Sequence, residues 1–265
     1  MTEAEYHSHP AMSQSKLKLL LENPRQFYLE HVLFIKQDKP TPSKNLGTCL
    51  DLALTDPEAY AKLEVKNTKT TSVEGYITEN WKRQIDIWME SLNNYKMEDS
   101  FFGGLTFGEI TATCTKQDMI FYSYAGIDWR MKTDYLNRKA GFFIDLKSTK
   151  AVTRDEFIKD CFNYDYHIQA ASYANGIKIA DKLSYLPRAY YVAVSTKTGE
   201  IFAFECSDQV IQLGMLEIER GCEIYKRNLE TNDWARDKPL SILTAPEWQE
   251  NQILSNYNQF FGVSK

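Results

Sequence analysis

The stretch that decides the fold is GFFIDLKSTK, residues 141–150. It starts with Gly141 and three apolar residues, as expected of a strand that enters a hydrophobic core, and continues with Asp145 and Lys147. Because side chains alternate between the two faces of a strand, these two charged groups project to the same face. A strand that is apolar in its first half therefore ends in an acid and a base side by side.

A second acid precedes this strand. Residues 125–136 read as a strand, and the connection LNRKAG, residues 136–141, joins it to the strand at 141–147. Asp134 stands eleven residues before Asp145 and shares a face with Asp128, Arg130 and Lys132. Two carboxylates and an ammonium are therefore expected to meet at one end of the sheet.

These groups suit one kind of chemistry. Two neighbouring carboxylates repel each other unless a cation joins them, and Mg²⁺ binds one or two carboxylates while keeping water and phosphate ligands. A lysine beside the metal can orient water or stabilise charge on a phosphate, which suits hydrolysis of a phosphodiester. Taken alone, a D-x-K tripeptide is more simply the polar end of a strand.

The rest of the chain predicts an α/β fold. Helical patterns occupy residues 13–33, 45–63 and 76–97, and residues 105–114, 118–137 and 140–149 read as three strands of a meander. A helix over 153–180, a hairpin over 188–207 and a helix over 207–229 follow. We expect a mixed central sheet flanked by helices in one domain, residues 1–265, with a mobile arm at 1–12 and an irregular tail at 231–265.

Composition excludes several classes of protein. The net charge of −5 argues against a protein that coats nucleic acid generally, although it allows a local basic groove. No apolar run approaches the ~20 residues that span a bilayer, and residues 1–16 carry no signal-peptide core. The five scattered cysteines are typical of reduced thiols in a cytoplasmic protein, and no Walker A pattern is present.

The ordered motifs resemble a known superfamily. Asp134 followed by Asp145-Leu146-Lys147 resembles the PD-(D/E)xK nuclease motif, and Gln169-x-x-x-Tyr173 resembles the signature of its RecB-like branch. Glu109 matches the extra acid of that branch, and LGTCLDLAL resembles its G-x-x-x-H helix, with Asp51 in place of histidine. Residues 12–31 and 240–250 look like segments of the RecE (exonuclease VIII) type, so the resemblance runs from about residue 11 to 250.

The resemblance implies a role for each matched residue. Asp134 and Asp145 would bind the metal with the backbone carbonyl of Leu146, and Lys147 would position or activate water. Glu109 would be a further metal ligand or base, unless it is a solvent-facing strand acid. Asp51 would be a metal ligand or an inert surface residue. The residues expected to contact DNA are Gln169, Tyr173, Arg130 and Lys150. For Gln169 and Tyr173, the alternatives are that they brace the metal ligands or pack the helix. For Arg130, the alternative is a salt bridge along the sheet.

The resemblance also implies an activity. We expect a Mg²⁺-dependent exodeoxyribonuclease, with Mn²⁺ able to substitute, that degrades linear double-stranded DNA 5′ to 3′ in phage-type recombination. A RecT-like single-strand annealing partner, a homo-oligomer around DNA and a place in the cytoplasm of a bacterial host would accompany it. Alternatives are an endonuclease, a helicase-associated nuclease, or a non-catalytic DNA-binding module. Asn23 stands where iron–sulfur relatives have cysteine, so no iron–sulfur cluster is expected.

Overall fold

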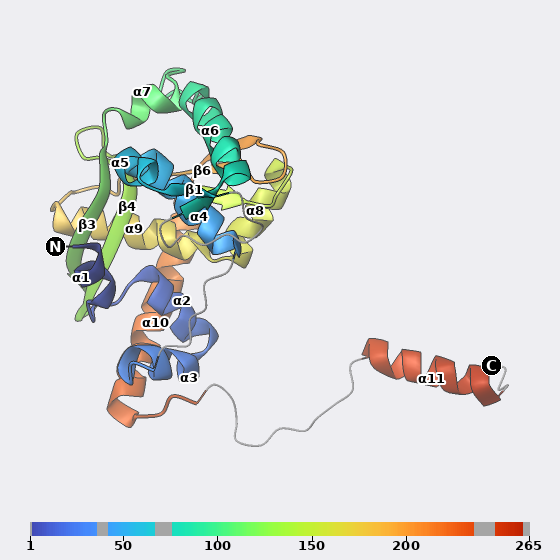
Figure 1. The fold of residues 1–265 in the computed structure, drawn as a ribbon. Helices are drawn as coiled ribbons and strands as arrows, with labels where there is room; N and C mark the ends of the chain where they lie inside the picture. Colours follow the sequence, from blue (N-terminus) through green and yellow to red (C-terminus); the bar gives the residue numbers. More distant parts are fainter. Residues whose placement is uncertain (1, 36–41, 67–75, 236–246, 262–265) are drawn as a thin grey trace. The chain divides into compact units, whose positions relative to one another are not determined.

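The computed structural model describes residues 2–35, 42–66, 76–235 and 247–261. The chain divides into two compact units, Met1–Trp234 and Ala235–Lys265. The first unit holds the sheet and the helices that pack on it (Figure 1). The second unit contains helix α11, Glu247–Phe261, which is described by itself.

The first unit is built mainly from helices and one five-stranded sheet. Its helices are α1 Glu3–Ser8, α2 Gln14–Glu22, α3 Pro24–Phe27, the π-helix η1 Tyr28–Val32, α4 Pro42–Thr55, α5 Pro57–Ala61, α6 Glu79–Asn94, α7 Phe107–Thr111, α8 Arg154–Asn163, α9 Tyr166–Ala180 and α10 Asp208–Thr231. Its strands are β1 Glu64–Lys66, β2 Tyr76–Thr78, β3 Thr115–Tyr124, β4 Ile127–Asn137, β5 Phe142–Thr149, β6 Arg188–Ser195 and β7 Ile201–Glu205.

The five-stranded sheet is mixed. Its order is β3-β4-β5-β6-β7, and only β5 and β6 run parallel. The β3–β4 hairpin turns at Ala125 and Gly126, whose φ angles are 53° and 74°. Positive φ at both central residues is typical of the type I′ turn, which matches the twist of two paired strands. The parallel pair β5–β6 needs a crossover, which α8 and α9 supply.

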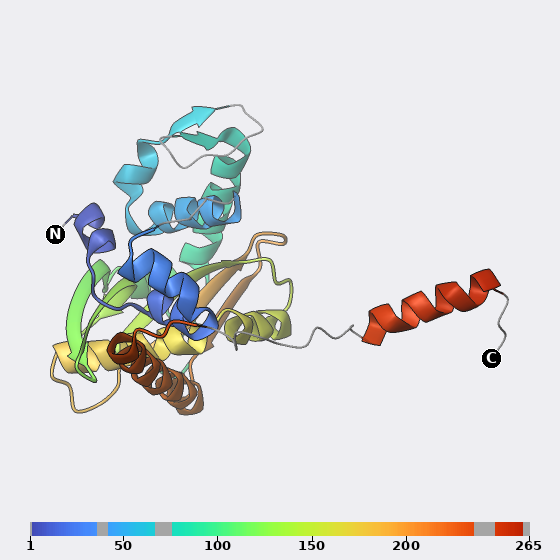
Figure 2. The same cartoon turned by 90° about the horizontal axis from the view of Figure 1, so that it is seen from below.

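Helices cover both faces of this sheet (Figure 2). On one face α9 and α10 pack over a cluster that includes Trp129, Phe143 and Ile177. On the other face α4, α6 and α7 pack over a cluster that includes Ile85, Trp88 and Ile144. Alternate residues of β5 therefore enter different clusters, and the face that carries Phe143 is also the face of Asp145 and Lys147.

The fold class predicted from the sequence is confirmed, with one correction in the meander. The three strands of the meander are β3, β4 and β5, so residues 118–137 form a hairpin. Residues 105–114 contain the helix α7, because Thr106 and Glu109 form a capping box that satisfies the first N–H groups of a helix. That box pairs a threonine with a glutamate three residues later, just before Ile110, and can be read from the sequence.

The two chain ends also differ from expectation. The segment expected to be a mobile arm forms α1 and packs on the sheet, where Tyr6 and Met12 are buried and the Met12 backbone exchanges hydrogen bonds with Asp128 and Arg130. The tail expected to be irregular contains α11, while residues 236–246 and 262–265 lie outside the described residues. None of the helices in the described ranges combines the length and the apolar character needed to cross a membrane.

Candidate active site

The site begins where β4 and β5 separate. Their ladder extends from Asn137–Phe142 to Tyr135–Ile144 and stops there. Asp134 and Asp145 are the next residues on the two strands, so they stand at the mouth of the fork. The Leu146 N–H donates to Asp134 Oδ2 at 2.7 Å, a bond from a strand amide to a side chain in place of a further ladder bond. The fork therefore places both carboxylates where the sheet opens.

Asp145 is buried, with 3% of its surface exposed. Its Oδ1 accepts a hydrogen bond of 2.5 Å from Gln169 Nε2 on α9. Its Oδ2 forms an ion pair with Lys147 Nζ. Both oxygens of the buried carboxylate are therefore held in place by neighbouring side chains.

Lys147 is held from three sides. Besides its ion pair with Asp145, its Nζ donates to Gln169 Oε1 at 3.0 Å and lies 4.7 Å from the centroid of the Tyr166 ring. Burial is the largest influence on the pKa of Lys147 and lowers it, but the charges of Asp145, Tyr166 and Asp134 together outweigh burial and the net shift is upward. Lys147 therefore stays an ammonium, with its position fixed by the same glutamine that holds Asp145.

Asp134 carries a carboxylate that lies near two other carboxylates, those of Asp145 and Asp51. Burial and the carboxylates of Asp145 and Asp51 raise its pKa well above the usual range, more than Lys147 and the Leu146 N–H lower it. A divalent cation between Asp134 and Asp145 would relieve this repulsion. The donor set therefore fits Mg²⁺, which takes its remaining ligands from water and phosphate oxygens. Within the described ranges no three His, Cys, Asp or Glu side chains form a ready-made metal cluster.

These groups line one cavity of about 290 Å³. Asp51 reaches it from α4, and its Oδ1 accepts a hydrogen bond of 3.3 Å from Gln117 Nε2. Tyr173 reaches it from α9, and burial together with the charges of Asp145 and Asp134 raises its pKa well above 10. The cavity thus unites seven side chains expected from the sequence: Asp51, Arg130, Asp134, Asp145, Lys147, Gln169 and Tyr173.

Arg130 lines the same cavity and is only 6% exposed. Its Nη2 donates to the His7 carbonyl at 3.2 Å, and its guanidinium lies 4.7 Å from the Tyr6 ring centroid. Its Nε and Nη1 are buried and have no hydrogen-bond partner. Burial lowers the pKa of Arg130, although a guanidinium remains charged. Two guanidinium nitrogens without a partner, on a residue that lines the cavity, are complementary to a phosphate.

The structure corrects the expected role of Glu109. Glu109 lies on α7, is exposed, and accepts hydrogen bonds from the N–H and hydroxyl of Thr106, so it is not brought to the carboxylates. Gln169 is 6% exposed and uses both ends of its amide on Asp145 and Lys147. These bonds place it to brace the site, which is one of the two roles expected for it; contact with DNA stays a prediction.

Two further predictions concern Lys150 and the backbone carbonyl of Leu146. Lys150 follows the end of β5 and lines another cavity, described below. Leu146 lines the 290 Å³ cavity and its N–H serves Asp134; its carbonyl as a metal ligand stays a prediction.

Sequence reasoning missed three contributors. Tyr6 and His7 line the cavity because the N-terminal segment packs on the sheet. Tyr166 covers the Lys147 ammonium with its ring. An aromatic residue in a helical pattern is most simply read as core, so no local signal distinguishes Tyr166. Tyr6 packs against Phe121, with 6.2 Å between the ring centroids. Because these residues are far apart in the chain, no local sequence signal indicates this contact.

Comparisons with known proteins identify the family of the chain and a similar fold. No curated protein matches the sequence. The crystal structure of a candidate exonuclease from Eubacterium rectale superposes with a TM-score of 0.62 and 18% identity, over 91% of this chain and 96% of that one, which shows the fold. The structure of SSO0001, at a TM-score of 0.36, 11% identity and coverage of 82% and 81%, is too distant to carry an argument. The model of a family described as a PDDEXK-like domain of unknown function (DUF3799) matches residues 13–237, and the chain therefore belongs to that family.

Proposed function

We propose that this protein is a metal-dependent nuclease that acts as an exonuclease on linear double-stranded DNA. The observation that carries the proposal is the arrangement of Asp134, Asp145 and Lys147 in one cavity, braced by Gln169. The PDDEXK-like fold gives the same expectation. The name of the Eubacterium rectale protein, a candidate exonuclease, favours attack from a DNA end.

Each side chain has a distinct part in this chemistry. Asp134 and Asp145 would hold Mg²⁺ or Mn²⁺, with Asp51 as a possible third acid next to them. The bound metal supplies positive charge to the phosphate and lowers the pKa of water. Lys147, fixed by Asp145 and Gln169, presents an ammonium to the attacking water and to the charge that develops on the phosphate. Gln169 keeps both groups in place through the reaction.

Arg130 would bind a phosphate of the substrate. Arg130 lines the cavity and its Nε and Nη1 have no hydrogen-bond partner, so contact with a phosphate would replace an unfavourable buried state with a charge-assisted hydrogen bond. A local cation of this kind is needed because the chain as a whole is acidic, with a net charge of −5. Tyr173, at the same cavity, is placed to contact the sugar–phosphate backbone.

The resemblance to RecE-type nucleases supports the finer part of the proposal. We infer 5′ to 3′ degradation, a role in phage-type recombination in the cytoplasm of a bacterial host, and a RecT-like annealing partner that takes over the exposed strand. We also infer a homo-oligomer around DNA, which would increase processivity. These inferences rest on the resemblance of residues 12–31 and 240–250 to RecE-type segments, together with the ordered motifs between them.

Digestion of end-labelled DNA tests the proposal. Linear duplexes labelled at either 5′ end and a covalently closed circle are incubated with the protein, with and without Mg²⁺. We expect the linear duplex to be consumed only with metal, its 5′ label to be released first, and the circle to survive. Rapid linearisation of the circle would favour an endonuclease, and no cleavage under any metal would favour a non-catalytic DNA-binding module.

A further inference from the structure

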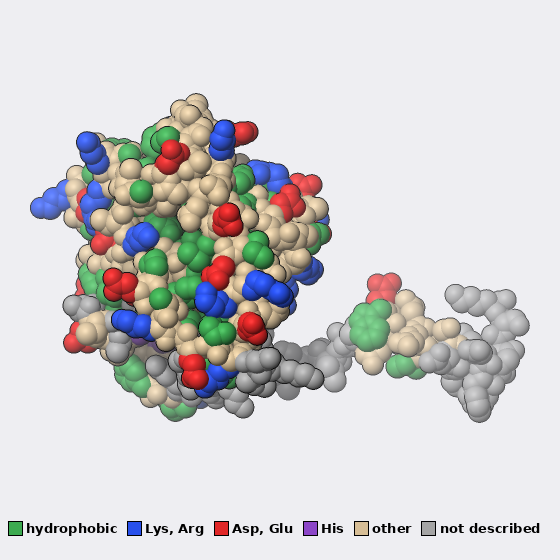
Figure 3. All heavy atoms as spheres, turned by 45° about the horizontal axis from the view of Figure 1, so that its top comes forward, with side chains coloured by type: hydrophobic (Ala, Val, Ile, Leu, Met, Phe, Trp, Pro, Cys, Tyr) green, Lys and Arg blue, Asp and Glu red, His purple; other side chains and the backbone are tan. Residues whose placement is uncertain are grey.

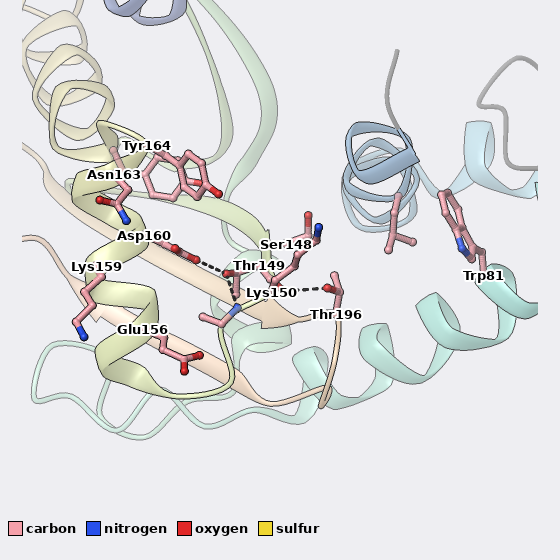
Figure 4. Close-up of a pocket in the computed structure, with 13 residues that line it drawn as sticks. Trp81, Ser148, Thr149, Lys150, Glu156, Lys159, Asp160, Asn163, Tyr164 and Thr196 are labelled. Atoms are coloured by element: carbon pink, nitrogen blue, oxygen red, sulfur yellow. Dashed lines mark hydrogen bonds between the residues drawn. The ribbon is translucent and has the colours of Figure 1, made fainter. Parts of the chain in front are cut away.

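A second cavity, of about 820 Å³, lies at the ends of β5 and β6. Its lining includes Trp81, Lys150, Lys159, Asn163, Tyr164 and Tyr166, and we call it the strand-end groove. Figure 4 shows its two sides, with α8 on one side, Trp81 of α6 on the other, and the end of β5 between them. The proposed cleavage reaction does not use this groove.

The groove adjoins the candidate active site. Tyr166 lines the groove, and its ring lies 4.7 Å from Lys147 Nζ at the carboxylates. Lys150 follows Lys147 by three residues, which is about 10 Å along an extended chain. A DNA strand whose phosphate is held at Asp145 and Lys147 would therefore have its neighbouring nucleotides within reach of the groove.

The cations of the groove are available to a ligand. Lys150 and Lys159 are exposed, and neither forms an ion pair or side-chain hydrogen bond with another described residue. The two acids of the groove are engaged internally. Glu156 accepts a hydrogen bond of 2.7 Å from the Val152 N–H, and Asp160 accepts one of 2.9 Å from the Thr149 hydroxyl. The two carboxylates are thus held by hydrogen bonds within the protein, whereas the two lysine ammoniums have no such bond to another described residue and can pair with an anionic ligand.

Aromatic side chains stand on both sides of the groove (Figure 4). Tyr164 is 59% exposed at the end of α8, and Trp81 is half-buried on α6. Aromatic faces interleaved with lysines are typical of sites that bind single-stranded nucleic acid, because every unpaired base can stack on a ring. The bases of a duplex are already stacked and paired, and so could not use these rings.

We propose that the strand-end groove binds a single-stranded segment of DNA next to the cleavage site. Its bases stack on Tyr164 and Trp81, and its phosphates contact Lys150 and Lys159. This inference rests on the proposed nuclease function and deepens it: the enzyme would separate the strands at a DNA end and guide one of them past Lys147. It gives Lys150 a specific partner, the backbone of an unpaired strand.

Binding without cleavage tests this proposal. The full-length Asp145→Asn chain is titrated in EDTA against a fluorescein-labelled oligothymidylate of about 12 nucleotides and against a labelled blunt duplex. Tyr164→Ala and Lys150→Gln are added to this background. The controls are Tyr185→Ala and Lys139→Gln, which remove an exposed ring and an exposed lysine at the opposite end of β5, near Gly141.

We expect Tyr164→Ala to weaken oligothymidylate binding on the order of 10-fold, and Lys150→Gln to reduce the slope of log K against log salt by about 0.7. Both controls should leave the affinity unchanged, and the duplex should be affected less than the single strand. Unchanged binding by both groove variants, or losses no larger than those of the controls or of the duplex, would overturn the proposal. Cleavage is assayed separately on the chain with Asp145 intact, so an inactive enzyme would contradict the proposed function while binding still decides the groove.

Discussion

Gln169 shows how one side chain can organise a site. Its amide donates to Asp145 through Nε2 and accepts from Lys147 through Oε1. An amide suits this position because it offers a donor to the carboxylate and an acceptor to the ammonium. Gln169 lies on α9, which packs on the sheet face that carries Asp145 and Lys147. The i, i+4 spacing then brings Tyr173 to the same cavity.

This bracing role predicts the effect of Gln169→Ala. Loss of the partner that orients a metal ligand typically costs about 10- to 100-fold in metal affinity or activity, and we expect a loss of that size in the Mg²⁺-dependent rate. DNA affinity in EDTA should be unchanged, because Gln169 is buried. Gln212→Ala, at an exposed position of α10, is the matched control. A variant that loses DNA binding but keeps its metal dependence would contradict bracing.

Asp51 is the second residue whose role can be decided by substitution. It raises the pKa of Asp134 and lines the same cavity. If it holds metal, Asp51→Ala should lose activity that excess Mg²⁺ partly restores. Asp51→His should keep activity with a stronger preference for Mn²⁺, because imidazole is a softer ligand than carboxylate. Rates are measured against Mg²⁺ and Mn²⁺ concentration for all three forms, and overlapping curves would exclude Asp51 as a ligand.

At the scale of elements, the sequence predicts the strands of the site better than their ends. The alternation in residues 141–149 and the spacing of Asp134 and Asp145 predict β4, β5 and the face that they share. The fork between them depends on where the ladder stops, at Tyr135–Ile144. Local periodicity does not indicate where a ladder stops, so the sequence predicts both strands but not the fork between them.

The helix α7 shows a different reason for an error. Residues 105–114 are rich in β-branched and aromatic residues and read as a strand, yet the capping box of Thr106 and Glu109 decides for a helix. Side-chain hydrogen bonds to the first N–H groups outweigh a weak strand preference in so short a segment. The expected site role of Glu109 failed for the same reason.

Substitutions in α7 test that reading. Thr106→Ala removes the N-cap and should lower the free energy of unfolding by about 1 kcal/mol, measured by denaturant titration. Glu109→Ala should leave the metal-dependent cleavage rate unchanged, because its carboxylate serves α7 and lies outside the cavity. Asp134→Ala serves as the active-site comparison and should be inactive. A Glu109→Ala variant as inactive as Asp134→Ala would return Glu109 to the catalytic groups.

At the scale of the whole molecule, the first feature to consider is the distribution of charge. Acidic and basic side chains are interspersed on the face drawn in Figure 3, consistent with a modest net charge. In the proposed function, attraction to DNA would then come from local groups such as Arg130 and a bound metal. The mixed sheet with helices on both faces was predictable from the order of elements. The separation of residues 235–265 into a second unit was not, because no linker-like composition marks it.

The inferred homo-oligomer gives a prediction at this scale. Light scattering at working concentration should give a mass that is a small multiple of 30.7 kDa. The same measurement on the isolated first unit, residues 1–234, shows whether assembly depends on the unit that contains α11. A strict monomer for the full chain would contradict the oligomer and its processivity, and would leave the chemistry at Asp145 untouched.

The central claim is that Asp145 holds a metal on which cleavage depends. The most direct measurement compares the Mg²⁺-dependent degradation of an end-labelled linear duplex by the parental chain and by Asp145→Asn, which keeps the size of the side chain and removes its charge. We predict a loss of roughly 100-fold or more, with circular dichroism and DNA affinity in EDTA retained. Full activity of a folded Asp145→Asn chain would contradict the account.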